Sequence, residues 1–253
     1  MTSGGEETFL SHLIELRDRL LRIIGSVLLV FFLLFYWASD IYTLLAKPLL
    51  AALPSDGKMI ATDVVGVFLV PVKVTLLVAF LVALPYVLYQ IWAFVAPGLY
   101  SHEKRLVLPL VVTSSILFFA GMAFAYFVVF PSVFRFMAAI APQGVAWMTD
   151  IEKYFSFVLT MFVAFGVTFE TPVAVVVLVR LGVVTIEQLK QARPYVIVGA
   201  FVVGAVFTPP DVLSQLLLAI PVCLLYEGGI WVARLLAPKP AASPATIASP
   251  DLD

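Results

Sequence analysis

The class of this protein is set by residues 154–179, YFSFVLTMFVAFGVTFETPVAVVVLV, in which Glu170 is the only charged residue. A membrane-spanning helix needs about 20 consecutive apolar residues, so this stretch is long enough to cross a bilayer. A carboxylate at the centre of such a helix costs roughly 2.5–3.5 kcal/mol on insertion scales, and it normally faces a partner or a wet cavity. The stretch therefore predicts a transmembrane helix in which Glu170 either binds something or holds helices together.

The composition of the whole chain agrees with a membrane protein of several spans. Its 253 residues are 62% hydrophobic and 12% charged, whereas soluble domains carry about 25% charged residues. The net charge of −1 does not indicate a nucleic-acid partner, and the single cysteine, Cys223, excludes an intrachain disulfide. The acidic N-terminus, MTSGGEETFLSHLIELRDR, lacks the basic region and cleavage site of a signal peptide, so we expect the first span to be retained.

Six apolar runs predict six transmembrane helices: 20–39, 71–94, 106–132, 154–179, 194–207 and 212–231. The fifth run reaches only about 21 Å as a helix, against a hydrocarbon core of about 30 Å. The uncharged part of the sixth run, which ends before Glu227, is similarly short. We expect these two helices to form a tight hairpin through FTPPDV and to thin the bilayer locally.

Basic residues orient the predicted bundle. One side of the membrane receives ten of them: Arg17, Arg19, Arg22, Lys104, Arg105, Arg180, Lys190, Arg193, Arg234 and Lys239. The other side receives Lys47, Lys58, Arg135 and Lys153, with Lys73 at the edge of the second span. The positive-inside rule therefore places the N- and C-termini in the cytoplasm.

Prolines interrupt most spans, at Pro85, Pro109, Pro131, Pro172 and Pro221. Because an interior proline removes a backbone hydrogen bond and kinks its helix, the expected fold is an all-α, six-helix curved bundle. We expect one membrane domain over residues 1–235. The remaining residues, 236–253, are rich in Pro, Ala and Ser and predict a disordered cytoplasmic tail.

The segment HLIELRDRL, residues 12–20, has two alternative interpretations. On a helix, Glu15 lies four residues before Arg19, and Asp18 lies four before Arg22. Such pairs stabilise a helix by a few tenths of a kcal/mol, and spacing alone favours this structural role. The functional alternative is that Glu15 offers a carboxylate to a cationic ligand at the membrane surface.

A second candidate site is YQIWAFVAPGLYSHEKR, residues 89–105. Pro97 and Gly98 end the helix, and aromatic residues such as Phe94 suit the membrane interface. Glu103 follows in a short loop on the same membrane face as Glu15. Two such carboxylates can bind two guanidinium groups through charge-assisted hydrogen bonds, although an ordinary interfacial loop remains the slightly favoured alternative.

Catalytic chemistry finds no support in the sequence. His12 and His102 are the only histidines, and there is no HExxH, GxSxG or phosphate-binding glycine loop. Cys223 lies in an apolar run and is interpreted as a packed thiol. We therefore expect no enzyme activity, no cofactor and no metal site.

With these segments identified, the chain resembles the TatC family of the bacterial twin-arginine protein translocase, from about Phe9 to Arg234. The motifs that carry the resemblance are HLIELRDRL, MIATDV (59–64), YQIWAFVAPGLYSHEKR, AYFVVFP (125–131), FGVTFETPV (165–173) and RPYVIVGAFVVGAVFTPPD (193–211). Several long motifs in the same order make this resemblance specific. The tail departs from it, since it lacks the long charged run of some members.

The resemblance implies a non-enzymatic receptor in the bacterial inner membrane, driven by the proton-motive force, for folded cargo with paired-arginine signal peptides. Its implied signal-peptide-binding residues are Glu15, Arg17, Arg19, Phe94 and Glu103. Pro48 and Asp211 match outer-face positions of the family, and Glu170 matches its buried glutamate. Implied partners are the single-span TatA and TatB subunits, docked on the fifth and sixth helices within an oligomeric complex.

A different function class also accommodates Glu170. An ion-coupled small-solute transporter would use it as a proton site, but such a protein predicts several polar residues at mid-membrane and broken helices at matched positions. The sequence shows one strong mid-membrane charge and no convincing repeat. Uptake of a small solute, set against crosslinking to a twin-arginine peptide, distinguishes the two functions.

Overall fold

The computed structural model describes residues 3–50, 59–95, 107–140, 148–208 and 211–236, and apart from one isolated bridge its regular structure is helical. In chain order the elements are α1 (Ser3–Leu34), the 3₁₀ turn η1 (Phe35–Trp37), α2 (Ala38–Leu50), α3 (Gly66–Val95), α4 (Val107–Phe124), the π turn η4 (Ala125–Val129), α5 (Phe130–Ile140), α6 (Ile151–Phe169), α7 (Thr171–Arg180), α8 (Ile186–Gln191), α9 (Arg193–Phe207) and α10 (Val212–Leu236). Of the predicted tail, only Leu236 lies within the described residues.

The six predicted spans are confirmed. Five stretches of helix are long and apolar enough to cross a membrane: Ser11–Lys47, Gly66–Val95, Val107–Ile140, Ile151–Arg180 and Val212–Leu236. The fifth predicted span is the shorter helix α9, as expected. Helix α10 is longer than its uncharged part, because it continues beyond Glu227 to Leu236.

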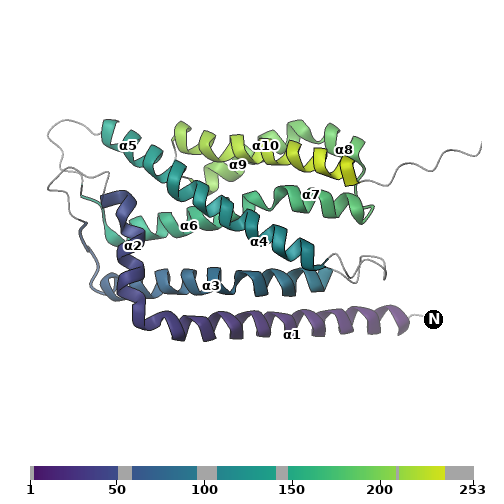
Figure 1. The fold of residues 1–253 in the computed structure, drawn as a ribbon, viewed down its shortest axis with the longest axis horizontal. Helices are drawn as coiled ribbons and strands as arrows, with labels where there is room; N and C mark the ends of the chain where they lie inside the picture. The colour runs from purple at the N-terminus through teal and green to yellow at the C-terminus, as the bar shows by residue number, and fades with distance from the viewer. Residues whose placement is uncertain (1–2, 51–58, 96–106, 141–147, 209–210, 237–253) are drawn as a thin grey trace, which may run out of the picture.

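The spans lie roughly side by side in an elongated bundle, with α2 turned across one end of it (Figure 1). Helix α1 packs mainly against α3, at the edge of the bundle. The start of α1, the short helix α8 and the end of α10 lie at the opposite end from α2 (Figure 1). We call this the cytoplasmic end, because it carries the predicted majority of basic residues, and we call the other the outer end.

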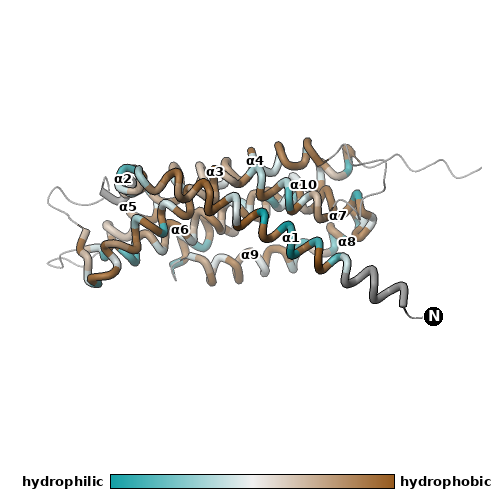
Figure 2. The backbone as a smooth tube through the Cα atoms, turned by 90° about the horizontal axis from the view of Figure 1, so that it is seen from below, coloured by the Kyte–Doolittle hydropathy of each residue, from teal (hydrophilic) through white to brown (hydrophobic). Residues whose placement is uncertain are grey.

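Apolar residues cover most of the length of the bundle (Figure 2). Large side chains such as Phe32, Phe127 and Trp231 are exposed on its surface, where the hydrocarbon of a bilayer would surround them. The interior holds an aromatic cluster around Phe130, Phe155 and several neighbouring rings. Because lipid tails are as apolar as the core, close packing rather than hydrophobicity must hold these helices together.

The fourth span is broken, whereas the sequence predicts one helix over 154–179. Helix α6 ends at Phe169 and α7 begins at Thr171, with Glu170 between them. Pro172 causes the break, since it has no N–H and its ring clashes with the carbonyl group four residues earlier. That carbonyl belongs to Thr168, and it accepts a hydrogen bond of 2.6 Å from the Thr171 hydroxyl instead.

Other prolines are accommodated differently. Pro85 and Pro221 lie inside α3 and α10, which continue through them. Pro131 follows the π turn η4, whose wider hydrogen bonding inserts extra backbone into the third span. This span also continues to Ile140, beyond the predicted boundary at residue 132.

Three glycines allow neighbouring helices to approach closely. A Cβ atom on Gly121 of α4 would lie 2.4 Å from the Phe165 carbonyl oxygen of α6. One on Gly166 would lie 2.4 Å from the Phe118 ring, so α4 and α6 fit together from both sides. On α10, a Cβ atom at Gly229 would lie 2.9 Å from the Cα atom of Pro172. Small residues of this kind are the usual basis of helix packing in membranes.

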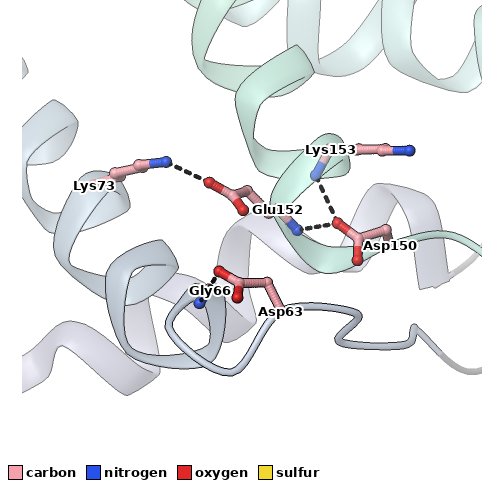
Figure 3. A network of polar contacts seen from close by, with 6 residues as sticks. All are labelled: Asp63, Gly66, Lys73, Asp150, Glu152 and Lys153. Atoms are coloured by element: carbon pink, nitrogen blue, oxygen red, sulfur yellow. Dashed lines mark hydrogen bonds and ion pairs between the residues drawn. The ribbon is translucent and has the colours of Figure 1, made fainter.

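The outer end is closed by a polar tie between two loops (Figure 3). Lys73 of α3 forms an ion pair of 2.7 Å with Glu152 at the start of α6. The backbone N–H of Ile60 donates to the Thr149 carbonyl group at 3.0 Å, and the N–H of Ile151 donates to the Ile60 carbonyl group at 2.9 Å. These bonds form the isolated bridge, so the MIATDV segment is bound to the loop before α6.

Asp150 is the centre of this outer tie. Its carboxylate caps α6 by accepting from the backbone N–H groups of Glu152 at 2.9 Å and Lys153 at 3.0 Å (Figure 3). It also accepts from the hydroxyl and the N–H of Thr62. The Thr62 hydroxyl, together with the backbone donors, lowers the pKa of Asp150 to about 2.

We predict that Gly229→Val destabilises the folded protein while Gly228→Val does not. A valine at residue 229 would meet Pro172, and overpacking costs about 1–3 kcal/mol. Gly228 has open space around its Cα and provides a matched control in the same helix. Thermal unfolding of the two purified variants in one detergent is the measurement, and equal melting temperatures would contradict the proposed close packing.

We also predict that Asp150→Ala lowers the melting temperature in detergent by the same amount at about pH 8 and about pH 5. A carboxyl group with a lowered pKa contributes stability above its unfolded-state pKa, and this contribution is lost as the pH falls toward the folded value of about 2. Asp150 thus remains ionised at both pH values. Equal melting temperatures of the wild type and the variant at about pH 5 would disprove this.

Candidate functional site

The first candidate site lies at the cytoplasmic end, where α1 packs against α3. Arg19 donates from Nε and Nη2 to Oε1 of Glu15, at 2.9 Å and 2.6 Å. Its Nη1 donates to Oε1 of Gln90 at 3.2 Å. Gln90 is only 3% exposed, so the guanidinium group connects a surface carboxylate to a buried amide of the neighbouring helix.

The predicted pair of Glu15 and Arg19 is thus formed, but the predicted pair of Asp18 and Arg22 is wrong. Asp18 instead accepts from Nε and Nη2 of the adjacent Arg17, at 3.0 Å and 2.9 Å. This pair is exposed. Arg17 therefore lies at the surface near the site but does not contact Glu15.

Phe94 packs at the same interface of α1 and α3. Its ring stacks on the ring of His12, with centroids 4.3 Å apart and planes 17° from parallel. Residues 90–94 of α3 thus hold two contacts to α1, one polar and one aromatic. Together they fix the position of Glu15 relative to the end of α3.

Glu103 lies outside the described residues, so its distance from Glu15 stays untested. Residues 96–106, which include it, connect Val95 at the end of α3 to Val107 at the start of α4. Of Pro48, the described part is its backbone in α2, at the outer end. Asp211, also predicted at the outer face, caps α10 by accepting from the Ser214 N–H at 2.7 Å.

Glu170 lies at the break between α6 and α7, inside the membrane-spanning part of the chain. Both of its carboxylate oxygens are buried and make no hydrogen bond with any described residue. Thr168 and Thr171 line a cavity of about 410 Å³ between α6 and α9, but the Glu170 side chain is not part of its lining. The two threonines therefore border a mostly apolar cavity that the Glu170 side chain does not line.

The register of α4 against α6 identifies what faces Glu170. The two helices are antiparallel, and Phe118 of α4 packs on Gly166 of α6. One turn back along α4 lies Ser114, which therefore meets the chain one turn further on, at Glu170. Ser114 is fully buried, and its hydroxyl group accepts a hydrogen bond of 3.1 Å from Trp92 Nε1.

Sequence reasoning missed Gln90 and Ser114 as parts of these sites. Each is a polar residue within an apolar run, in YQIWAFV and VVTSSILFF respectively. This was the available signal, because polar side chains inside spans usually face partners. Trp92 belongs to the same aromatic-rich segment as Phe94, but its hydrogen bond to Ser114 is visible only in the structure.

The hairpin of α9 and α10 is held together at both ends. Near the cytoplasmic end, Arg193 forms an ion pair of 2.7 Å with Glu227. Toward the outer end, Gln215 Nε2 donates to the Phe201 carbonyl group at 2.9 Å. Several apolar side chains of α9 face outward, among them Val198, Val202 and Val206.

Within the described ranges, no three His, Cys, Asp or Glu side chains form a group suited to a metal ion. Cys223 is a partly exposed free thiol within α10. The geometry of the described sites is therefore that of ion pairs, a buried carboxylate and apolar surface.

Comparisons with known proteins agree on one family. Residues 11–221 match the family described as "TatC: Sec-independent protein translocase protein (TatC)". A relative from Azotobacter chroococcum mcd 1, named "Sec-independent protein translocase protein TatC", is 56% identical over 95% of this chain and 95% of its own length. The protein of the same name from Escherichia coli (strain K12) is 54% identical over 94% of this chain and 93% of its own.

A solved structure agrees with this placement. The structure titled "Crystal Structure of Twin Arginine Translocase Receptor- TatC" aligns with a TM-score of 0.78 at 41% identity, over 88% of this chain and 98% of that chain. At such identity and coverage, the likeness extends beyond a shared arrangement of helices.

Proposed function

Because this chain belongs to the TatC family of Sec-independent protein translocase proteins, we propose that it is the signal-peptide receptor of a twin-arginine translocase and that Glu15 and Glu103 bind the paired arginines. It is a multi-pass protein of the bacterial inner membrane and a non-enzymatic subunit of a transport system. The cargo would be folded proteins, and export would be driven by the proton-motive force.

One observation carries the assignment of Glu15. Its Oε1 already accepts two bonds from a guanidinium group, that of Arg19, while Oε2 makes no hydrogen bond with any described residue. A planar guanidinium group suits a carboxylate because its donors form a fork. An incoming arginine can use Oε2 or replace Arg19, so the site has the chemistry that a paired-arginine peptide requires.

Neighbouring groups support a binding surface for the rest of such a peptide. The stacked rings of His12 and Phe94 lie at the same end of α1 and α3. Exposed apolar side chains, such as Leu16 and Leu20, lie along α1 close to Glu15. In this proposal the arginines meet carboxylates at the cytoplasmic surface, while the apolar part of the signal peptide enters the bilayer beside α1.

We further propose that the single-span subunits TatA and TatB dock on α9 and α10. The outward-facing valines of α9 support this, because they present an exposed apolar stripe at helical spacing. The ion pair of Arg193 with Glu227 would hold that surface rigid. The alternative of an ion-coupled solute transporter has no such support, since the described contacts of Glu170 include no chain of polar partners across the membrane.

We predict that Glu15→Ala and Glu103→Ala each weaken crosslinking to a twin-arginine peptide by about tenfold, because one charge-assisted hydrogen bond is worth roughly 1.5 kcal/mol or more. Glu187→Ala is the matched control, as it removes an exposed carboxylate of α8 at the same end. Peptide photocrosslinking in inverted membrane vesicles is the measurement. Normal crosslinking by both glutamate variants would mean that Glu15 has only a structural role, as the partner of Arg19.

A second prediction concerns Glu170, whose buried carboxylate has no ion-pair partner among the described residues. Glu170→Ala should insert and fold, since removal of a charge from a span relieves roughly 2.5–3.5 kcal/mol of insertion cost. It should reduce export of a twin-arginine reporter more than it reduces peptide crosslinking. Glu170→Gln should be milder if charge is not required. Normal export by the alanine variant would mean that Glu170 is dispensable.

A further inference from the structure

The break at Glu170 also opens a wedge on the cytoplasmic side of the bundle. Helix α6 stays against α4, through Gly121 and Gly166. Beyond the break, α7 packs instead on α10, where Gly229 meets Pro172. Helix α4 and helix α7 contact each other only lightly, so they separate toward the cytoplasmic end (Figure 1).

A cavity of about 470 Å³ occupies this wedge, between α4, α7 and α10. Its walls are almost entirely apolar and include Pro109, Thr113 and Leu117 of α4 and Pro172 and Val176 of α7. Arg180, the last residue of α7, is the only charged residue among those described that line it. From Pro172 to Arg180 the helix rises about 12 Å at 1.5 Å per residue, so the cavity runs from the interface into the hydrocarbon layer.

We propose that this cavity binds an anionic phospholipid, with an acyl chain in the apolar wedge and the phosphate beside Arg180. The charge pattern fits this ligand, since one cation stands at the depth of the headgroups and apolar residues continue inward from it. Arginine also suits phosphate geometrically, through paired N–H donors. The cytoplasmic leaflet supplies such lipids at this depth.

The alternative occupant of this cavity is a helical peptide or a single-span helix. A helix with side chains is about 10 Å across. An extended acyl chain is much thinner and enters without separation of α4 from α7. The wedge is also distinct from the surface around Glu15, which lies between α1 and α3.

The test is native mass spectrometry of the purified full chain, with phosphatidylglycerol and phosphatidylcholine of identical acyl chains supplied in equal amounts. The wild type should retain phosphatidylglycerol preferentially. Arg180→Gln should weaken that retention about fivefold, the worth of one cation near a charged surface. Arg180→Lys should largely preserve it. Arg234→Gln, which removes an exposed cation outside the cavity lining at the same end, should change nothing.

A second pair of variants tests the wedge itself. Thr113→Phe fills the cavity from an exposed position and should reduce retention of both lipids, whereas Val112→Phe at the exposed neighbouring position should not.

Excess inorganic phosphate should not displace the lipid. The proposal is overturned if Arg180→Gln retains phosphatidylglycerol like the wild type, if Thr113→Phe retains both lipids, or if phosphate alone displaces them. A photocrosslinker at residue 113 should yield a lipid adduct, and a peptide or protein adduct in its place would also overturn the proposal.

Discussion

The structure depends on how the backbone N–H and C=O groups find hydrogen-bond partners where the fourth span breaks. In hydrocarbon, each unpaired N–H or C=O group costs several kcal/mol, so a span tolerates a break only if side chains replace the lost bonds. Here the Thr171 hydroxyl group donates a hydrogen bond to the Thr168 carbonyl group, which Pro172 cannot pair because it has no N–H. With this replacement bond, the two halves of one span pack on different neighbours: α6 packs on α4, and α7 packs on α10.

Several ion pairs lie toward the two ends of the bundle. The Lys73–Glu152 pair closes the outer end, while Arg19–Glu15 and Arg193–Glu227 lie toward the cytoplasmic end. These three pairs each join one helix to another or extend to a buried partner on another helix. Glu170 differs from them, because its carboxylate is buried at the level of Ser114 on α4 without an ion-pair partner among the described residues. This isolation is the reason why a role in transport, rather than in stability, is proposed for Glu170.

Much of the fold is predictable because length and basic residues determine span number and orientation. The break at Glu170 is not, since a run of valines and phenylalanines with one proline is equally consistent with a kinked but continuous helix, such as α3. The site is predictable at Glu15 and Arg19, where helical spacing fixes the contact. Gln90 and Ser114 form hydrogen bonds with residues 22 or more positions away in the chain. The local periodicity of the sequence carries no information about such pairs.

The outer tie has a consequence for how the protein is made. Thr62 and Asp150 bond across 88 residues of chain, and Lys73 and Glu152 across 79. A chain that has delivered only its first three spans to the membrane therefore has an incomplete outer end, with Lys73 lacking its counter-ion. The tie can close only when the loop before the fourth span has crossed the bilayer. The bonds of the outer tie therefore form only in chains whose insertion has passed the third span.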